Sequence, residues 1–247
     1  MKKMYQKDWF GIPFQSFGKM SSHKLADSEF YSNFYKEFFK NYSSYDDLKE
    51  DWKKSKLELA EWIAGRISKG KVLSIGSGLS FMEKVMHENY KSLEVHVQDY
   101  ASVSLKWIQN VLPKNQIHFV GNKIQIDDFN IVFLSNVDYS IPKETLAEIL
   151  NDIQNYMHPN SELIIMNTTT IFSDLKLSTI QKTKNIIKYI LTILKLYSKG
   201  QFWGWQRTPE EYREILSESN LQFIEDGVIY PGGVKHYFIV GEKLKNI

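Results

Sequence analysis

A glycine-containing turn and a carboxylate about 20 residues beyond it are the residues best suited to bind a nucleotide-like ligand. Gly76-Ser77-Gly78 follows an apolar run that ends at Ile75, and Ser80 precedes a predicted helix over residues 81–90. Glycine tolerates positive φ and lets a ligand approach the backbone, while the first turn of a helix offers unpaired N–H groups. Asp99 ends the next apolar run, where a carboxylate can accept hydrogen bonds from ribose hydroxyls. Taken alone, the turn fits either a nucleotide site or an ordinary tight turn.

The elements that must position these residues alternate between apolar strands and helices. We predict strands over 72–75, 93–98, 117–120, 130–134, 162–167, 221–230 and 236–240, and helices over 101–111, 143–156 and 209–219. Repeated βα units with apolar strands indicate a parallel sheet covered on both faces. Ligands of such sheets bind at the carboxyl ends of the strands. The glycine turn, Asp99, Asn122, Asn136 and Asp138 are all expected at that edge.

Composition limits the function classes. With 247 residues, 43% hydrophobic and 24% charged, the chain is expected to be a soluble globular domain with a cap. The net charge of +2 does not favour a nucleic-acid partner. The absence of cysteine excludes disulfides, thiolate metal sites and thiol catalysis. We predict no metal site, because no His or carboxylate cluster has ligand spacing. No signal peptide or transmembrane segment is visible, so the expected compartment is the cytoplasm.

Residues 1–69 are expected to form an N-terminal helical and aromatic cap ahead of a domain over 70–247. Aromatic residues recur at helical spacing over 29–41, and a further helical piece covers 45–67. These rings either pack on the sheet or form a lid over the glycine turn, and both can hold for different residues. In the second case the rings facing the ligand would be Tyr5, Trp9, Tyr31 or Tyr35.

Residues 170–207 are an insertion in the alternating pattern. A long helix with a basic surface is predicted over 178–197, which packs on the core or a partner subunit, or lies on a membrane surface. Residues 201–207 join Trp203 and Trp205 to Arg207, which can bind a carboxylate or phosphate through two hydrogen bonds. This segment recognises an anionic or sugar-like acceptor, or its rings fill space under the lid while Arg207 pairs with a nearby glutamate.

Two cofactor classes fit the glycine turn with Asp99, namely dinucleotides and S-adenosylmethionine. The dinucleotide fingerprint needs a third glycine where this chain has Phe81, and this argues against NAD. A Tyr-x-x-x-Lys pattern over 139–143, typical of short-chain reductases, contains Pro142 and precedes the predicted helix. We interpret that pattern as chance.

With these residues the chain resembles the class I S-adenosylmethionine-dependent methyltransferases over roughly residues 60–245. The first motif of that family, an acid followed by Gly-x-Gly-x-Gly, corresponds to residues 74–80, with Ser74 replacing the acid and Ser80 the last glycine. Asp99 matches the ribose-binding acid, and Tyr100 falls where a residue covers the adenine. Gly121-Asn122 matches the pair that borders the adenine amino group.

The resemblance implies a Rossmann-like three-layer sandwich with a seven-stranded, mostly parallel sheet and one antiparallel strand. It implies S-adenosylmethionine as cofactor and S-adenosylhomocysteine as product. The implied cofactor-binding residues are Ile75, Gly76, Ser77, Gly78, Ser80, Asp99, Tyr100, Asn122, Ser135 and Asn136.

The chemistry requires little beyond placement, because the sulfonium activates the methyl group and the acceptor must lie about 3 Å away. An oxygen or nitrogen acceptor can also need a base. The catalytic candidates are Asp138, in the loop after the fourth strand, and His236, at the mouth of the last hairpin. The substrate-binding candidates are Tyr31, Tyr139, Trp205 and Arg207.

The predicted function is methyl transfer to a small-molecule acceptor, at an oxygen of a metabolite or of a cell-surface glycan precursor. The protein is expected to be a monomer or a homodimer. The alternatives are an NAD(P)-dependent oxidoreductase and a noncatalytic S-adenosylmethionine-binding partner that regulates a paralogue.

Overall fold

The computed structural model describes residues 1–119, 128–172 and 200–243. Its centre is a seven-stranded sheet in the order β10-β11-β8-β7-β4-β5-β6. The strands are β4 (Gly70–Ile75), β5 (Leu93–Asp99), β6 (Ile117–Phe119), β7 (Phe129–Ser135), β8 (Met157–Asn167), β10 (Leu221–Ile229) and β11 (His236–Lys243). Strand β11 is antiparallel to both of its neighbours, and the other pairings are parallel. The predicted sheet with one antiparallel strand is therefore confirmed.

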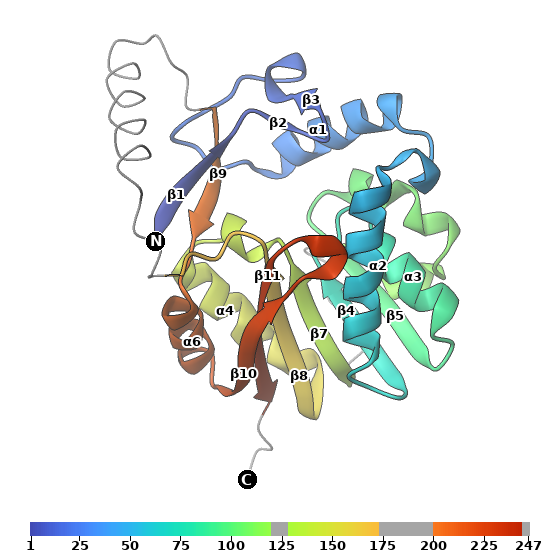
Figure 1. The fold of residues 1–247 in the computed structure, drawn as a ribbon, viewed down its shortest axis with the longest axis vertical. Coiled ribbons are helices and arrows are strands. Elements are labelled where there is room, and N and C mark those ends of the chain that lie inside the picture. Colours follow the sequence, from blue (N-terminus) through green and yellow to red (C-terminus); the bar gives the residue numbers. More distant parts are fainter. Residues whose placement is uncertain (120–127, 173–199, 244–247) are drawn as a thin grey trace.

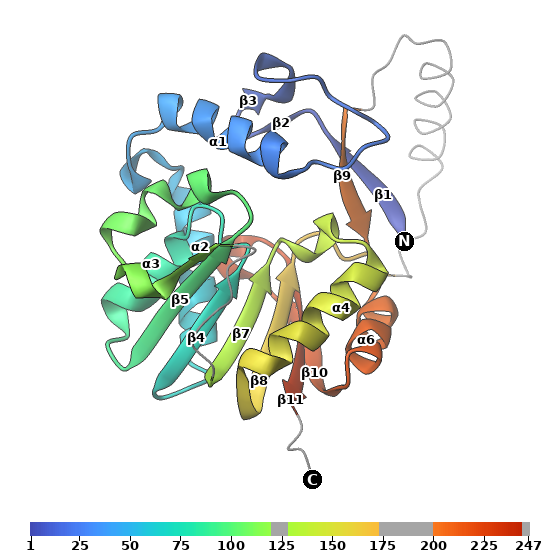
Figure 2. The ribbon, with the colours of Figure 1, turned by 180° about the vertical axis from the view of Figure 1, so that it is seen from behind.

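Helices cover both faces of this sheet (Figures 1 and 2). Helices α2 (Glu50–Ala64) and α3 (Phe81–Asn89) pack on one face, and α4 (Lys143–Ile153) and α6 (Pro209–Glu218) on the other. In β4, Val72 faces α2 and α3, whereas Leu73 faces α4 and α6. Because side chains alternate along a strand, Ser74 shares the face of Val72. Burial on both sides fixes this register, since a one-residue slip would exchange the two faces.

A cap lies over the carboxyl ends of the parallel strands (Figure 1). It consists of β1 (Lys2–Gln6), β2 (Asp8–Trp9), β3 (Ile12–Pro13), α1 (Ser28–Asn41) and β9 (Gln201–Gln206). Strand β1 pairs antiparallel with β9, which joins the start of the chain to the predicted insertion. The rings of α1 form a buried cluster with Phe14 and Trp203. The helix expected over 29–41 is confirmed, whereas the four strands of the cap, β1, β2, β3 and β9, were not predicted.

Two helix starts agree with their sequence signals. Asp27 caps α1 by accepting a hydrogen bond from the backbone N–H of Phe30. Thr208 and Glu211 form a capping box at α6, with Pro209 in the first turn.

The helix predicted over 101–111 is wrong. Short 3-10 turns occupy Ser102–Lys106 and Ile108–Asn110 instead. The backbone N–H of Ala101 donates to Asp99 Oδ1 at 2.8 Å, and Ser104 Oγ donates to the Ala101 carbonyl at 2.7 Å. Such local bonds between side chains and backbone compete with a regular helix.

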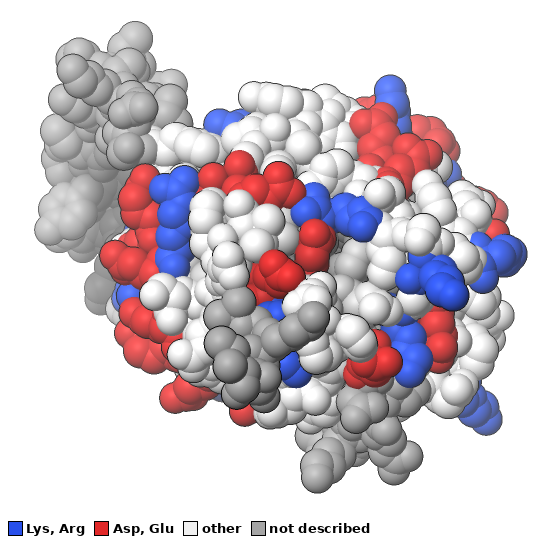
Figure 3. All heavy atoms as spheres, turned by 90° about the horizontal axis from the view of Figure 1, so that it is seen from below, with Lys and Arg blue, Asp and Glu red and all other residues white. Residues whose placement is uncertain are grey.

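Other expectations differ in detail or cannot be compared. Strand β8 begins before its predicted start at residue 162, and its pairing with β7 passes from Met157 directly to Glu162. The helix predicted over 178–197, with its possible membrane contact, lies outside the described residues, as does Asn122. No helix in the described ranges is long and apolar enough to cross a membrane. On the side opposite the cap, acidic and basic side chains are interspersed (Figure 3).

Candidate active site

A cavity of about 1200 Å³ lies between the carboxyl edge of the sheet and the cap. Its floor comes from the turns after β4, β5 and β7, and its roof from β1, α1 and β9. The predicted site residues that line it are Tyr31, Ile75, Gly76, Ser77, Gly78, Ser80, Asp99, Tyr100, Ser135, Asn136, Tyr139 and His236. Tyr5, Trp9 and Tyr35, the other rings proposed for a lid, line it as well. Three predicted residues within the described ranges, Asp138, Trp205 and Arg207, do not.

The glycine turn has the conformation that its sequence predicts. Gly76 has a φ of +67°, and a Cβ built on it would lie 2.5 Å from Val137 Cγ2. The N–H groups of Gly76 and Ser77 donate to the Gln98 carbonyl at 2.7 and 3.2 Å, which fixes the turn to β5. Ser80 has a φ of 57°, so it adopts the left-handed conformation although it is not glycine. Ser80 therefore adopts the backbone conformation expected of the last glycine of the motif, and the turn is kept.

Asp99 connects this turn to the end of β5. Its Oδ2 accepts a hydrogen bond from the Gly78 N–H at 2.7 Å, and its Oδ1 accepts one from the Ala101 N–H at 2.8 Å. The side chain is buried, and this burial raises the pKa of its carboxyl while the backbone hydrogen bonds oppose the shift. Each carboxylate oxygen keeps a second lone pair for a ligand. Tyr100, next in the chain, lines the cavity and is 57% exposed.

Two polar residues after β7 line the cavity beside the turn. Asn136 has a φ of 56°, and its Oδ1 accepts hydrogen bonds from the N–H and the hydroxyl of Thr168 at 3.0 and 3.1 Å. This side chain thereby connects the ends of β7 and β8. The buried hydroxyl of Ser135 has no hydrogen-bond partner among the described residues.

A buried acid at the cavity was missed from the sequence. Glu83 lies in the first turn of α3, is 2% exposed, and lines the cavity. Its Oε1 accepts a hydrogen bond from Ser74 Oγ at 2.5 Å, and its Oε2 has no hydrogen-bond partner in the part of the chain that the structure describes. A carboxylate of the following helix therefore lies beside position 74, where the sequence has serine. A signal was present, because Glu83 is flanked by the inward-facing Met82 and Val85.

Lys56 of α2 also lines the cavity and was missed. Its side chain is partly buried, and its Nζ lies 5.9 Å from the centre of the Trp52 ring. Desolvation lowers the pKa of Lys56 to about 8. Burial raises the pKa of Glu83 to about 7, while the hydrogen bond from Ser74 and the charge of Lys56 oppose that shift.

The buried acid leads to a prediction about stability. The pKa of Glu83 rises from 4.5 to about 7 on folding, so its favourable contribution is present below pH 4.5 and is lost as the pH rises through 7. As the pH rises from 4.5 to 8, the free energy of unfolding of the wild type is therefore expected to fall by about 2–3 kcal/mol more than that of Glu83→Gln. Urea denaturation of the ligand-free proteins at several pH values measures this difference. Parallel pH profiles would contradict the prediction.

The roof of the cavity is aromatic. The Tyr31 and Trp203 rings lie 5.6 Å apart, and Trp203 Nε1 donates to the Tyr139 hydroxyl at 3.2 Å. All three residues line the cavity. Burial raises the pKa of Tyr139 to about 12, so its hydroxyl stays protonated near neutral pH.

Trp203 occupies the position expected for Trp205. The pairing of β9 with β1 passes from Gly204 opposite Met4 to Phe202 opposite Tyr5, which leaves Trp203 as an extra residue. Such a bulge changes which face the following side chains point to. Trp205 contacts Phe202, at 5.1 Å between ring centres, and does not line the cavity. The position in the cavity that was predicted for Trp205 is therefore held by Trp203.

Arg207 and Asp138 lie behind the cavity wall rather than on it. Both are fully buried, with Arg207 Nη1 3.8 Å from Asp138 Oδ2. Arg207 Nη1 donates to the Asp138 carbonyl at 2.7 Å, and its Nη2 donates to the Ile141 carbonyl. The Tyr212 hydroxyl donates to Asp138 Oδ2. Burial raises the pKa of Asp138 to about 6, opposed by Tyr212 and Arg207.

The roles predicted for this pair are corrected accordingly. The Arg207 guanidinium bonds the turn over 138–141, which presents Tyr139 to the cavity, and the Asp138 carboxylate accepts a hydrogen bond from Tyr212 of α6. Neither side chain is placed to touch an acceptor. The alternative pairing of Arg207 with a nearby glutamate is also not found among the described residues, where Arg207 forms its ion pair with Asp138 and Glu211 pairs with the amino group of Met1.

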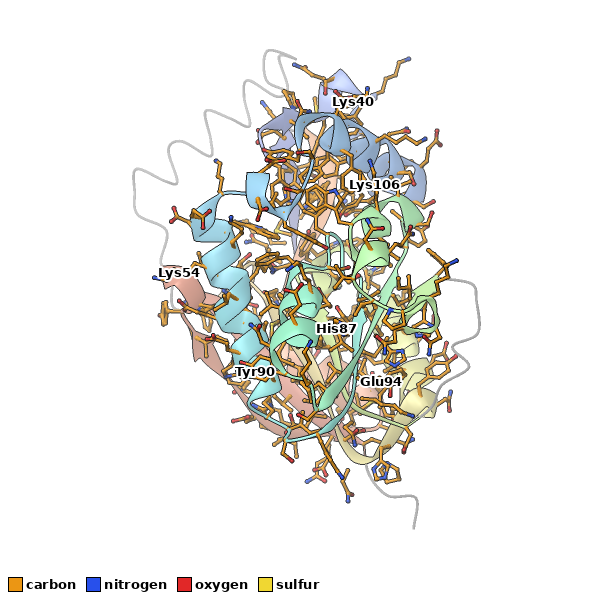
Figure 4. The ribbon with its side chains drawn as sticks, turned by 90° about the vertical axis from the view of Figure 1, so that its right-hand side faces the viewer. Lys40, Lys54, His87, Tyr90, Glu94 and Lys106 are labelled. Atoms are coloured by element: carbon orange, nitrogen blue, oxygen red, sulfur yellow. The ribbon has the colours of Figure 1, made fainter. Side chains whose placement is uncertain are left out.

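His236 remains in the cavity as a neutral imidazole. It is 2% exposed and begins β11, and its Nδ1 lies 3.0 Å from the Val234 carbonyl. Nδ1 therefore carries the proton and donates, which leaves the lone pair on Nε2. Burial lowers the pKa of His236, and this keeps the ring neutral near pH 7. His87 lies on the outer side of α3, away from the cavity (Figure 4).

No protein-family model and no curated protein matches this sequence. Solved structures are similar to it. A candidate O-methyltransferase of Nostoc punctiforme PCC 73102 superposes with a TM-score of 0.61 at 15% identity, over 93% of this chain and 66% of that one. Human N-acetylserotonin methyltransferase in complex with SAM gives a TM-score of 0.54 at 14% identity, over 89% of this chain and 57% of that one.

A smaller protein is similar as well. Magnesium protoporphyrin IX methyltransferase of Synechocystis PCC 6803 with bound SAH gives a TM-score of 0.51 at 15% identity, over 78% of this chain and 84% of that one. The chain thus spans less than two thirds of the length of the first two proteins, and most of the third. At these identities the likeness concerns the fold. This chain has the fold of the class I S-adenosylmethionine-dependent methyltransferases.

Proposed function

We propose that this protein is an S-adenosylmethionine-dependent methyltransferase that acts on a small-molecule acceptor. The observation that carries the proposal is the Gly76–Gly78 turn, joined to Asp99 at the carboxyl edge of the sheet and open to a large cavity. Structures of the same fold that contain SAM or SAH support it.

The residues present fit an adenosyl cofactor. The turn offers backbone without side chains, and a Cβ on Gly78 would lie 3.0 Å from the Tyr35 hydroxyl, so only glycine leaves this approach open. Asp99 provides carboxylate oxygens for ribose hydroxyls, and Tyr100 provides an aromatic ring at the cavity mouth. When bound, S-adenosylmethionine supplies a methyl group activated by its sulfonium. The protein must therefore hold the acceptor in line and exclude water.

The lining of the cavity favours an acceptor with a planar, apolar body. Tyr31, Tyr139 and Trp203 supply aromatic faces and hydroxyl groups together. The burial of Arg207 removes the guanidinium that had suggested an anionic acceptor. We therefore assign the acceptor to small metabolites rather than to charged glycan precursors.

His236 is the side chain that we assign to accept a proton from a hydroxyl acceptor. Its ring is neutral, lines the cavity, and keeps Nε2 as the acceptor nitrogen. Asp138 acts as a positioning residue for Tyr139 through the turn over 138–141.

Replacing Asp99 tests the function directly. Asp99→Ala is expected to weaken the binding of S-adenosylhomocysteine by ~10-fold or more, because two charge-assisted hydrogen bonds to the ribose are lost. Isothermal titration calorimetry measures this affinity, and Asp46→Ala, which changes an exposed carboxylate, is the matched control.

Three results would count against the assignment. An unchanged affinity in Asp99→Ala would remove the role of Asp99. Binding of NADH without binding of S-adenosylhomocysteine would favour the oxidoreductase alternative. Binding of S-adenosylmethionine without methyl transfer to any fraction of a metabolite extract would favour a noncatalytic regulatory role.

A further inference from the structure

Two side chains of opposite charge line the same cavity without pairing with each other. Lys56 comes from α2 and Glu83 from α3, and these helices pack together on one face of the sheet. The two lie close enough for Lys56 to lower the pKa of Glu83. Even so, no carboxylate of the described residues forms an ion pair with Lys56 within 4.0 Å. The Oε2 atom of Glu83 is buried and has no hydrogen-bond partner within residues 1–119, 128–172 and 200–243.

A buried polar atom without a partner is costly, and a buried charge without a partner is costlier. The surroundings of Lys56 and Glu83 do not neutralise them fully. The Trp52 ring contacts the ammonium, and Ser74 satisfies only one oxygen of Glu83. A purely anionic ligand would be attracted by Lys56 and repelled by Glu83, and a purely cationic ligand would meet the reverse. A ligand with adjacent ammonium and carboxylate groups pairs with both.

We propose that Lys56 and Glu83 form the subsite for the zwitterionic amino-acid end of the cofactor, with Lys56 binding its carboxylate and Glu83 its ammonium. Glu83 thereby supplies from helix α3 the acid that strand β4 lacks at Ser74. This inference rests on the proposed function and adds Lys56 and Glu83 to the residues that bind the cofactor.

The order of the elements supports this assignment. Ser74 directly precedes the glycine turn, and α3 begins directly after it, so the Ser74–Glu83 hydrogen bond closes the two ends of the turn. Asp99 bonds the same turn from the β5 side. The nucleoside site and the charged subsite thus lie on either side of one turn. A ligand with a nucleoside at one end and an amino acid at the other requires this arrangement.

Comparison of two nucleosides isolates this subsite. S-Adenosylhomocysteine carries the amino-acid end, whereas 5′-methylthioadenosine has the same nucleoside and lacks that end. Lys56→Met and Glu83→Gln are each expected to weaken S-adenosylhomocysteine binding by ~10-fold or more, and to change 5′-methylthioadenosine binding by less than about twofold. Titration calorimetry on the purified full chain measures both affinities.

A third probe separates the two assigned roles. Decarboxylated S-adenosylhomocysteine keeps the ammonium and lacks the carboxylate. Lys56→Met is expected to leave its binding unchanged within about twofold, whereas Glu83→Gln is expected to weaken it by ~10-fold or more.

Matched control variants lie on the same two helices. Lys54 lies on the outer side of α2 (Figure 4), so Lys54→Met removes an ammonium outside the cavity. Glu88 is exposed on α3, where it pairs with Lys84, so Glu88→Gln removes a carboxylate outside the cavity. Both controls are expected to keep wild-type affinity for S-adenosylhomocysteine. Circular dichroism confirms folding, and Lys56→Gln replaces Lys56→Met if the latter does not fold.

The outcomes distinguish this inference from the proposed function. If the variants lose affinity equally for S-adenosylhomocysteine and 5′-methylthioadenosine, or for neither, the subsite is overturned while the function stands. If the wild type binds neither nucleoside, the proposed function fails and the subsite fails with it.

Discussion

Replacing Arg207 with alanine is expected to lower the free energy of unfolding by about 3–5 kcal/mol. The guanidinium is fully buried, faces the Asp138 carboxylate, and donates to the carbonyls of Asp138 and Ile141. Its removal leaves a buried carboxylate with only neutral partners, Tyr212 and Asn167. Breaking a buried pair in this way is costly because the remaining charge cannot return to water. Urea denaturation of the ligand-free protein measures the change.

Two companion variants identify the cause. Arg213 pairs with Asp226 but is 47% exposed, so Arg213→Ala is expected to cost less than about 1 kcal/mol. Arg207→Ala leaves the Asp138 carboxylate buried without a cation, and Asp138→Asn removes that charge. The double variant is therefore expected to lose less stability than the sum of the two single changes. A loss of about 1 kcal/mol or less in Arg207→Ala, or strict additivity with Asp138→Asn, would show that the pair is not coupled.

The second large effect is expected at Gly204, in the β9 bulge. Its φ is +137°, and a Cβ built there would lie 2.0 Å from the backbone oxygen of Tyr139. The obstacle is main chain, so it cannot be relieved by a rotamer change. Gly204→Ala must either separate β9 from the turn over 138–141 or distort the bulge. We expect a loss of about 3 kcal/mol or more from steric overlap and backbone strain together.

Gly11 provides the matched control. It also has a positive φ, +74°, but a Cβ there meets nothing within 4 Å. Gly11→Ala therefore carries the backbone strain alone, expected at about 1–2 kcal/mol. Thermal and urea unfolding of both variants separate the strain from the overlap. If the two cost the same, contact with the Tyr139 backbone does not determine the stability of the roof.

The sheet and the glycine turn were predictable because their signals are local. Apolar runs of strand length, separated by turn residues, identified all seven strands of the sheet within a few residues. The carboxyl ends of parallel strands must share one edge, which brought Gly76, Asp99, Asn136 and Tyr139 to one cavity. Gly76 and Gly78 adopt the positive φ that glycine permits in such a turn.

The direction of individual side chains depended on partners far away in the chain. A one-residue bulge, set by the pairing of β9 with β1, places Trp203 in the cavity in place of the predicted Trp205. Arg207 and Asp138 bury each other behind the wall, because a buried charge is stable only beside a compensating one.

What the sequence by itself determined about this protein is the fold and the backbone of the nucleotide-like site, since both follow from short-range periodicity and from glycine. Only the tertiary structure decided which charges reach the cavity. Position 74 lacks the expected acid, yet Glu83 provides a carboxylate there through packing of α3 against β4, and Lys56 of α2 faces the same cavity. The physical reason is that the surroundings of a side chain are set by the elements packed around it, which neighbours in sequence do not specify.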